Sequence, residues 1–238
     1  MRLCINIDHI ATLRNARGGK VPDPVEAAGV VERAGADCIV CHLREDRRHI
    51  RDDDVKRLRK SISTKLDLEM AATPEIIAIA KQIKPDLVTL VPEKRKELTT
   101  EGGLDVIRLR TSLRKTIQEF HDEGIPVSLF VDPVHDQIEA SKEIESDMIE
   151  IHTGEYANAR SRASVLKQLN RIKEAALLAR TFDMGVNGGH GLDYSNIHPI
   201  VKIVDIEEVS IGHAVIVRAV EVGLKNAVKE MLTLLNRR

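Results

Sequence analysis

The fold is decided by a unit whose clearest copy is residues 23–43, DPVEAAGVVERAGADCIVCHL. An Asp-Pro pair opens this stretch, so a capping residue is followed by proline at the first helical position. Apolar residues at helical spacing follow, and Gly35 then supplies a stop. The run Cys38 to Leu43 is short and apolar, which is typical of a strand buried on both faces. A helix followed directly by such a strand is the building unit of an α/β protein.

The same unit recurs along the whole chain, about every 29 residues. Short β-rich apolar runs predict eight strands. They are Leu3 to Ile7, Cys38 to Leu43, Leu66 to Met70, Leu87 to Val91, Val127 to Val131, Met148 to His152, Met184 to Asn187 and Glu208 to Ile211. Eight such strands, each followed by a helix, predict one α/β domain over residues 1–238, a (β/α)8 TIM barrel with extra helices.

Helices are predicted between these strands from apolar spacing and end signals. The clearest are Val25 to Ala34, Glu75 to Ile83, Leu104 to Asp122, Ala163 to Phe182 and Ala219 to Leu235. An open doubly wound sheet is the alternative architecture, and it normally carries a glycine-rich turn after its first strand. Here residues 8–12, DHIAT, follow the first strand and contain no G-x-G-x-x-G motif, which favours the closed barrel.

Composition excludes several classes of partner. The 36 Lys and Arg residues balance 37 Asp and Glu residues, and only 2% of residues are aromatic, so neither duplex binding nor base stacking is indicated. No run free of charged residues exceeds nine residues, far below the roughly 20 that span a membrane. The N-terminus turns polar too soon for a signal peptide, and three cysteines cannot form a paired framework. We therefore expect a cytoplasmic protein with no nucleic-acid or membrane partner.

Two of the cysteines form a C-x-x-C sequence, Cys38 and Cys41. Residues three apart on a strand face opposite sides, so we expect neither a redox pair nor a shared metal from these two thiols. The chain also contains no H-E-x-x-H motif and no H-x-H in its first strand, so no metal site is expected.

Polar and ionisable residues gather at the carboxyl ends of the predicted strands, where an all-parallel barrel builds its active site. They are Asn6, Asp8 and His9, then His42 and Arg44, Glu69, Glu93 with Lys94 and Arg95, Asp132, Glu150 and His152, Asn187 and His190, and finally Gly212 with His213. A carboxylate inside an apolar strand, such as Glu69 or Glu150, is costly unless it is paired or functional. A polar barrel end hydrated by water is the plainer interpretation of each residue taken singly, but together they indicate an enzyme.

Several segments are suited to binding phosphate. Gly212 and His213 enter a predicted short helix, whose N-terminus attracts anions. Residues 188–191, GGHG, allow close backbone approach beside a titratable imidazole. Two basic loops, residues 14–20 and 44–49, would be ordinary solvated surface on helices. If these loops instead lie over the open end of the barrel, we expect their basic side chains to bind two anionic groups.

Long and unusual motifs carry a resemblance that runs from end to end of the chain. They are NIDHIATLRNAR at 6–17, HLREDRRHI at 42–50, LEM at 68–70, VPEKR at 91–95, TTEGGLDV at 99–106, IEIHTG at 149–154, GHGL at 189–192 and IGHA at 211–214. With these motifs the chain resembles the pyridoxine 5'-phosphate synthase family of vitamin B6 biosynthesis.

The resemblance implies an activity and an assembly. The activity is the condensation of 1-deoxy-D-xylulose 5-phosphate with 3-amino-2-oxopropyl phosphate, giving pyridoxine 5'-phosphate, phosphate and water. The family uses no metal and no organic cofactor, so its only small partners are the phosphorylated substrates. Its members assemble through dimers into a homo-oligomer, an octamer.

The resemblance also assigns roles to residues. His42 and Glu69 take the positions of proton acceptors, His190 that of a proton donor, and Glu150 that of a transition-state stabiliser. The substrate-binding positions fall on Asn6, Asp8, His9, Arg17, Arg44, His49, Thr99, Gly191, Gly212 and His213. One departure is Gly188, where the family has alanine before Gly-His-Gly; we expect it to loosen that loop and to leave the imidazole in place.

The chemistry of the residues fits this assignment, because forming an imine and closing a ring move protons on and off nitrogen, carbon and oxygen. Two other classes remain as alternatives. One is a metal-dependent barrel hydrolase or aldolase with His42, Glu69 and His190 as ligands. The other is a phosphosugar-binding protein without catalytic activity.

Overall fold

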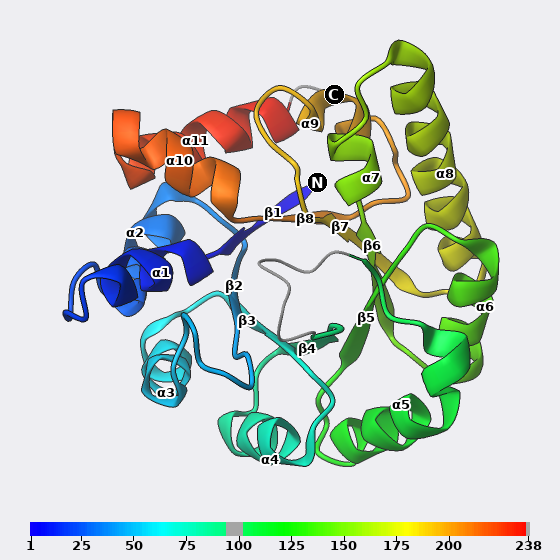
Figure 1. Cartoon of the computed structure of the whole chain (residues 1–238), viewed down its shortest axis with the longest axis horizontal. Coiled ribbons are helices and arrows are strands. Elements are labelled where there is room, and N and C mark those ends of the chain that lie inside the picture. Colours follow the sequence, from blue (N-terminus) through cyan, green and yellow to red (C-terminus); the bar gives the residue numbers. More distant parts are fainter. Residues whose placement is uncertain (94–101, 237–238) are drawn as a thin grey trace.

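The eight predicted strands all form, and they close into a parallel barrel in chain order (Figure 1). The computed structural model describes residues 1–93 and 102–236. The strands are β1 Arg2–Asn6, β2 Cys38–His42, β3 Lys65–Met70, β4 Leu87–Leu90, β5 Val127–Val131, β6 Met148–His152, β7 Gly185–Gly189 and β8 Glu208–Ile211. Pairing of β8 with β1, with Arg2 opposite Glu208 and Ile5 opposite Ile211, completes the closure. The predicted α/β class and (β/α)8 barrel are confirmed.

Helices surround the barrel on its outside (Figure 1). They are α1 Asp8–Ala16, α2 Pro24–Ala34, α3 Asp52–Ser61, α4 Pro74–Ile83, α5 Val106–His121, α6 His135–Glu143, α7 Gly154–Ala157, α8 Arg162–Thr181, α9 Ile197–Val201, α10 His213–Val222 and α11 Leu224–Leu235. The extra helices precede the usual ones after β1, β6 and β8. Among the described residues, none of the helices has both the length and the apolar character needed to cross a bilayer.

The helix that decided the fold begins and ends as its sequence predicts. The side chain of Asp23 accepts a hydrogen bond of 2.9 Å from the backbone N–H of Val25, and Pro24 occupies the first helical position. Gly35 ends the helix with φ 107°, a left-handed conformation that glycine adopts without steric cost. Strand β2 then starts three residues later, fully buried along its length.

The two faces of the strands bury different kinds of side chain. Leu3 and Ile5 of β1 face outward into the main apolar core beneath the helices, whereas Cys4 between them faces into the barrel. The interior carries polar groups instead of the bulky apolar layers usual for this fold. Thr89 donates a hydrogen bond of 2.9 Å to Asp67, and Asn187 donates one of 3.1 Å to Glu208. These polar layers lie directly beneath the carboxyl ends of the strands.

Cys38 and Cys41 face opposite sides of β2, as predicted. Cys38 packs inside the barrel with Cys4 and Val40, while Cys41 belongs to the outer core. All three thiols are free and buried.

Two predicted segments differ from the structure. The helix predicted over 219–235 is instead two helices, α10 and α11, because Gly223 adopts φ 81° and breaks the hydrogen-bonded ladder. The basic loop predicted over 14–20 is partly helical, because α1 continues to Ala16. Arg14 therefore lies in the last turn of a helix, with consequences for the site described below.

Candidate active site

A cavity of about 650 Å³ opens at the carboxyl ends of the strands. All the described residues to which the resemblance assigns a catalytic or substrate-binding role line it except Arg17, whereas the strand-end residues Glu93, Asp132, His152 and Asn187 do not. Those lining it are Asn6, Asp8, His9, His42, Arg44, His49, Glu69, Glu150, His190, Gly191, Gly212 and His213. The barrel therefore gathers the predicted acids and imidazoles into one space, as the strand-end pattern indicated. Thr99 lies outside the described residues.

His42 is the centre of a hydrogen-bonded group at the end of β2. Its Nε2 lies 2.8 Å from Glu93 Oε1, and its Nδ1 lies 3.9 Å from Glu69 Oε2. The backbone N–H of His42 donates to Asp8 Oδ1 at 2.9 Å, so the first helix and the second strand are tied together beneath the cavity. Because a carboxylate only accepts, Nε2 carries the proton toward Glu93 and Nδ1 is left to face Glu69.

Two carboxyl groups of the barrel interior have raised pKa values. Burial raises the pKa of Glu69 well above its usual value, and the negative charges of Glu150 and Asp8 raise it further. Burial together with the charges of Asp67 and Glu208 raises the pKa of Glu150 to about 8. One oxygen of Glu150, Oε2, is buried without a hydrogen-bond partner among the described residues. Glu150 can therefore donate or accept a proton near neutral pH, and Glu69 holds its proton more tightly than a free carboxyl group does.

His190 follows β7 and packs against a second histidine, His152. Their ring centroids are 5.1 Å apart. Burial, and then the proximity of His152, lower the pKa of His190 to about 4, so its imidazole is neutral at pH 7. His190 also has φ 74°, a left-handed conformation uncommon outside glycine and frequent at functional sites.

His152 is in turn oriented by an acid. Its Nδ1 lies 2.8 Å from Asp132 Oδ1, and this hydrogen bond lowers the pKa of Asp132. The bond fixes the ring so that its other nitrogen is turned to the side of His190, where a side chain on Gly154 would collide with both imidazoles. Asp132, His152 and His190 thus form a row of neighbouring polar side chains that ends at the cavity.

Two further histidine pairs lie on the β1 side of the cavity. His9 and His213 meet edge to face with centroids 5.1 Å apart, and burial lowers the pKa of His9. The His42 and His49 rings are 5.9 Å apart, and burial also lowers the pKa of His49. The backbone N–H of Ile50 donates to His49 Nδ1 at 2.9 Å, which leaves Nε2–H of the neutral ring as a donor.

The glycines of the cavity allow close approach of the backbone. Gly212 caps α10, and a Cβ there would lie 3.1 Å from the backbone oxygen of Asn6. The first residues of this ten-residue helix, His213 and Ala214, also line the cavity, so its N-terminal N–H groups face a potential anion. Gly191 has φ 79°, and a side chain there would come within 2.7 Å of Ala157.

The basic loops contribute less than the sequence indicated. Arg14 is buried and makes a bidentate pair with Asp54, at 2.6 and 2.8 Å, so it stabilises the fold and does not reach the cavity. Arg47 is held by Asp52 at 2.6 Å and does not line the cavity either. Arg17 is exposed at the end of α1. Arg44, Arg48 and His49 do line the cavity.

Some residues of this site were absent from the catalytic and substrate-binding positions that the resemblance assigns. Glu93 and His152 contact predicted residues directly, and Phe130 and Ser210 line the cavity wall. The sequence did contain a signal for the first two, because both lie at the carboxyl end of a strand or directly after it. The residues that Glu93 and His152 contact could not be predicted without knowing how the strands align in the barrel.

The structure also bears on metal binding at this site. Among the described residues, Asp8, His42 and His49 place one ligand atom each within 4.8 Å of the others. The alternative ligand set of His42, Glu69 and His190 does not form such a group in the described parts of the chain.

A parallel barrel whose strand ends gather imidazoles, carboxyl groups and a helix N-terminus at one cavity has the layout of a (β/α)8-barrel enzyme. Comparison with known proteins narrows this class. Residues 3–237 match the family described as pyridoxal phosphate biosynthesis protein PdxJ. The chain belongs to this family, and it is an enzyme of vitamin B6 biosynthesis.

Its relatives match over nearly their full length. The pyridoxine 5'-phosphate synthase of Chlorobium chlorochromatii is 57% identical over 99% of this chain and 100% of the relative. That of Geobacter metallireducens is 54% identical over 98% of both.

Solved structures with a similar fold are much more distant in sequence. A 3-hexulose-6-phosphate synthase superposes with a TM-score of 0.66 at 16% identity, covering 98% of this chain and 99% of the other. A 4-hydroxy-2-oxoglutarate aldolase/2-deydro-3-deoxyphosphogluconate aldolase gives 0.67 at 15% identity, over 99% and 94%. These similarities concern the barrel fold alone.

Proposed function

We propose that this enzyme condenses 1-deoxy-D-xylulose 5-phosphate with 3-amino-2-oxopropyl phosphate to form pyridoxine 5'-phosphate, phosphate and water. The observation that carries the proposal is the single cavity in which His42, Glu69 and His190 meet beside a helix N-terminus. The shared family and the name of the relatives support the same product.

His42 and Glu69 act as the proton acceptors of the early steps. With Nε2–H committed to Glu93, the Nδ1 lone pair of His42 is available on the side of Glu69. Carbinolamine formation and its dehydration to an imine need a group that takes a proton from nitrogen and returns one to oxygen. Glu69, whose pKa is raised by burial, exchanges protons with that imidazole.

His190 and Glu150 act on the opposite side of the cavity. The low pKa of His190 describes a cavity without an anion; a phosphate or phosphate leaving group beside it raises that pKa, because a nearby negative charge favours imidazolium. His190 then donates a proton to the leaving group. Glu150, protonated at pH 7, donates a hydrogen bond to oxygen anions that develop in the transition state.

Two anion sites are needed, because one phosphate remains in the product and the other leaves. One site consists of Gly212, His213 and the N-terminus of α10, with His9 beside it. The second is formed by Arg44, His49 and the loop after β2, where arginine matches phosphate oxygens with a pair of donors. Asn6 and Asp8 bind the polar centre of the substrates, Gly191 lets the backbone approach them, and Thr99 and Arg17 contact them on closure.

The same proposal includes the assembly and location of the enzyme. Exposed apolar side chains on α1, on the segment after it and on α10 (Leu13, Val21, Val217 and Val220) would be buried between copies of the chain. We propose a homo-oligomer, an octamer built from dimers, acting in the cytoplasm, where three free thiols stay reduced. Light scattering coupled to size exclusion tests the assembly, and a mass of one chain would refute it.

The activity is tested by mixing the purified protein with both substrates in the presence of a chelator. We expect release of phosphate together with pyridoxine 5'-phosphate, detected chromatographically. His190→Ala should lose turnover with little loss of folding, and Arg59→Ala, an exposed change on α3, is the matched control.

Each alternative class gives a different result in this assay. Activity that appears only with an added divalent ion would favour the metal-dependent class, and the Asp8, His42 and His49 group would be its site. Binding of both substrates without any product would favour the non-catalytic class. Either result would overturn the proposed reaction.

A further inference from the structure

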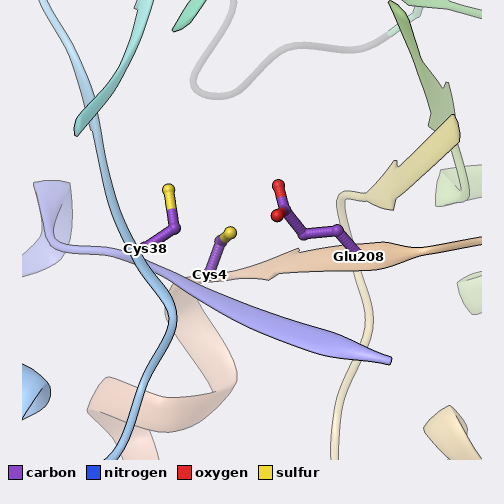
Figure 2. Close-up of side chains that lie close together, drawn as sticks. All are labelled: Cys4, Cys38 and Glu208. Atoms are coloured by element: carbon purple, nitrogen blue, oxygen red, sulfur yellow. The ribbon is translucent and has the colours of Figure 1, made fainter. Parts of the chain in front are cut away.

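A second cluster of reactive side chains lies inside the barrel, one layer below the cavity. Cys4 of β1, Cys38 of β2 and Glu208 of β8 point toward one another (Figure 2). One ligand atom from each lies within 4.8 Å of the other two. None of the three lines the catalytic cavity, whose floor on β1 and β8 is formed by Asn6 and Ser210, two residues further along each strand.

The register of the barrel creates this cluster. Cys4 is the direct partner of Cys38 on one side and of Ser210 on the other, and Glu208 pairs with Arg2 one step below. Because side chains alternate along a strand, all three cluster members face the interior. They are almost completely buried, with 1% of Cys4, 2% of Cys38 and 5% of Glu208 exposed.

We propose that Cys4, Cys38 and Glu208 bind one thiophilic divalent cation of the Zn²⁺ class. Two sulfurs and a carboxylate oxygen form a ligand set suited to a tetrahedral ion of borderline softness, with one position left. Asn187 lies beside that position, since its Nδ2 donates to Glu208 Oε1 at 3.1 Å. Its Oδ1 is buried without a hydrogen-bond partner among the described residues, so an oxygen is available for the fourth position directly or through water.

The charges around the cluster balance when a divalent ion is bound. Two thiolates and a carboxylate carry three negative charges, and the ion supplies two positive ones. The third comes from Arg2, whose Nε donates to Glu208 Oε2 at 2.9 Å. Arg2 also donates to Glu207 at 3.3 Å, so this balance counts only the three ligands, the ion and Arg2.

Loading is an exchange of protons for the ion. In the metal-free state Cys38 Sγ lies 3.5 Å from the carbonyl oxygen of Ile39, to which a thiol proton can be donated. Each thiol loses its proton to solvent as its sulfur bonds to the cation, and no electron is transferred.

Binding would join the first, second and last strands of the barrel at one point. It would act on stability, and none of its three ligands lines the catalytic cavity. This inference does not depend on the proposed reaction.

The test uses the reduced, chelator-treated full-length protein, with Cd²⁺ and Zn²⁺ as probes. We expect one equivalent of Cd²⁺ per chain and a near-ultraviolet thiolate-to-cadmium absorption. Cys4→Ser and Cys38→Ser should each lower the affinity at least about 100-fold and weaken that absorption. Cys41→Ser is the matched control, since it removes a buried thiol on the outer face of the same strand, and it should change neither measurement.

A measurement on the unaltered protein covers the case in which the serine variants do not fold. X-ray absorption of the Zn²⁺-loaded enzyme should show two sulfur ligands at about 2.3 Å together with oxygen or nitrogen at about 2.0–2.2 Å. A Zn²⁺ shell without sulfur would place the ion at the Asp8, His42 and His49 group and overturn the proposal. So would the absence of cadmium absorption in the folded reduced protein, an unchanged spectrum in Cys4→Ser, or loss of the spectrum in Cys41→Ser.

Discussion

Removing one partner of the buried Arg14–Asp54 ion pair should destabilise the enzyme more than any exposed ion-pair substitution. The two side chains are 4% and 3% exposed, and two hydrogen bonds of 2.6 and 2.8 Å join them. Asp54→Ala would leave the Arg14 guanidinium buried with only its bonds to the His49 carbonyl and to Asn15. It would also remove the acceptor of the Arg51 N–H at the start of α3.

The magnitude follows from the cost of an unpaired buried charge. Breaking one side of a buried ion pair costs about 3–5 kcal/mol, against a total stability of about 5–15 kcal/mol for an ordinary domain. For a chain of this size the loss corresponds to a fall in Tm of about 6–20 °C. Replacing both residues by apolar ones of similar volume, Arg14→Met with Asp54→Leu, should be less damaging than either single change, because no charge is left without a partner.

Thermal and urea unfolding followed by circular dichroism provide the measurement. Arg59→Ala is the control: its bond to Asp86 is 2.8 Å long but both side chains are more than a third exposed, so we expect a cost below about 1 kcal/mol. An Asp54→Ala variant as stable as Arg59→Ala would refute the argument. A double variant that loses as much as the sum of the single ones would refute it too.

Three further predictions concern the cavity and its surroundings. The pKa of His190 is held at about 4, below its usual value, so the unfolded chain binds more protons than the folded chain between pH 4 and 6.5. The stability that His190 contributes should therefore be fully present above pH 6.5 and should fall toward pH 4. In acid unfolding curves, His190→Gln should show a smaller fall than the unaltered protein. Gly189→Ala should lower kcat strongly, because its Cβ would collide with Glu150. Gly188 lies inside β7 and not in the loop that the sequence analysis expects it to loosen, and a Cβ there meets its nearest neighbours at 3.8 Å. Gly188→Ala should therefore leave steady-state kinetics and Tm within error, and equal effects of the two changes would contradict this. Arg17→Ala should raise KM more than it lowers Tm, because an exposed side chain at the end of α1 buries little surface, and an unchanged KM with a lowered Tm would remove Arg17 from the substrate-binding set.

Strand positions were predictable because burial on both faces leaves a continuous apolar signature. Runs such as Leu87 to Val91 are too short and too β-rich to be helices, and their recurrence fixes the barrel. The position of the site followed from the same signature, since the carboxyl ends of parallel strands meet at one pole. The strand-end pattern therefore predicts that residues as distant in sequence as His42 and His190 share one cavity, and in the structure they do.

The sequence could not predict which residue each charged side chain pairs with. Arg14 was assigned to a clamp over the cavity because it stands among other basic residues, but its partner is an aspartate 40 positions away. The same limitation hid the Glu93–His42 bond across two strands. Nor did apolar spacing alone predict the break between α10 and α11, because the pattern continues through Gly223 while the backbone does not.

The pairing of β1 with β8 has a consequence for synthesis in the cell. At about 5–20 residues per second, translation of this 238-residue chain lasts about 12–48 s, and β1 is made at the start of that interval. Until residues 208–211 leave the ribosome, β1 has a free edge, as does β7, and free edges invite pairing with other chains. Nascent chains of this protein therefore depend on protection from aggregation almost to the end of their synthesis, and products shortened before residue 208 should accumulate as aggregates rather than as smaller barrels.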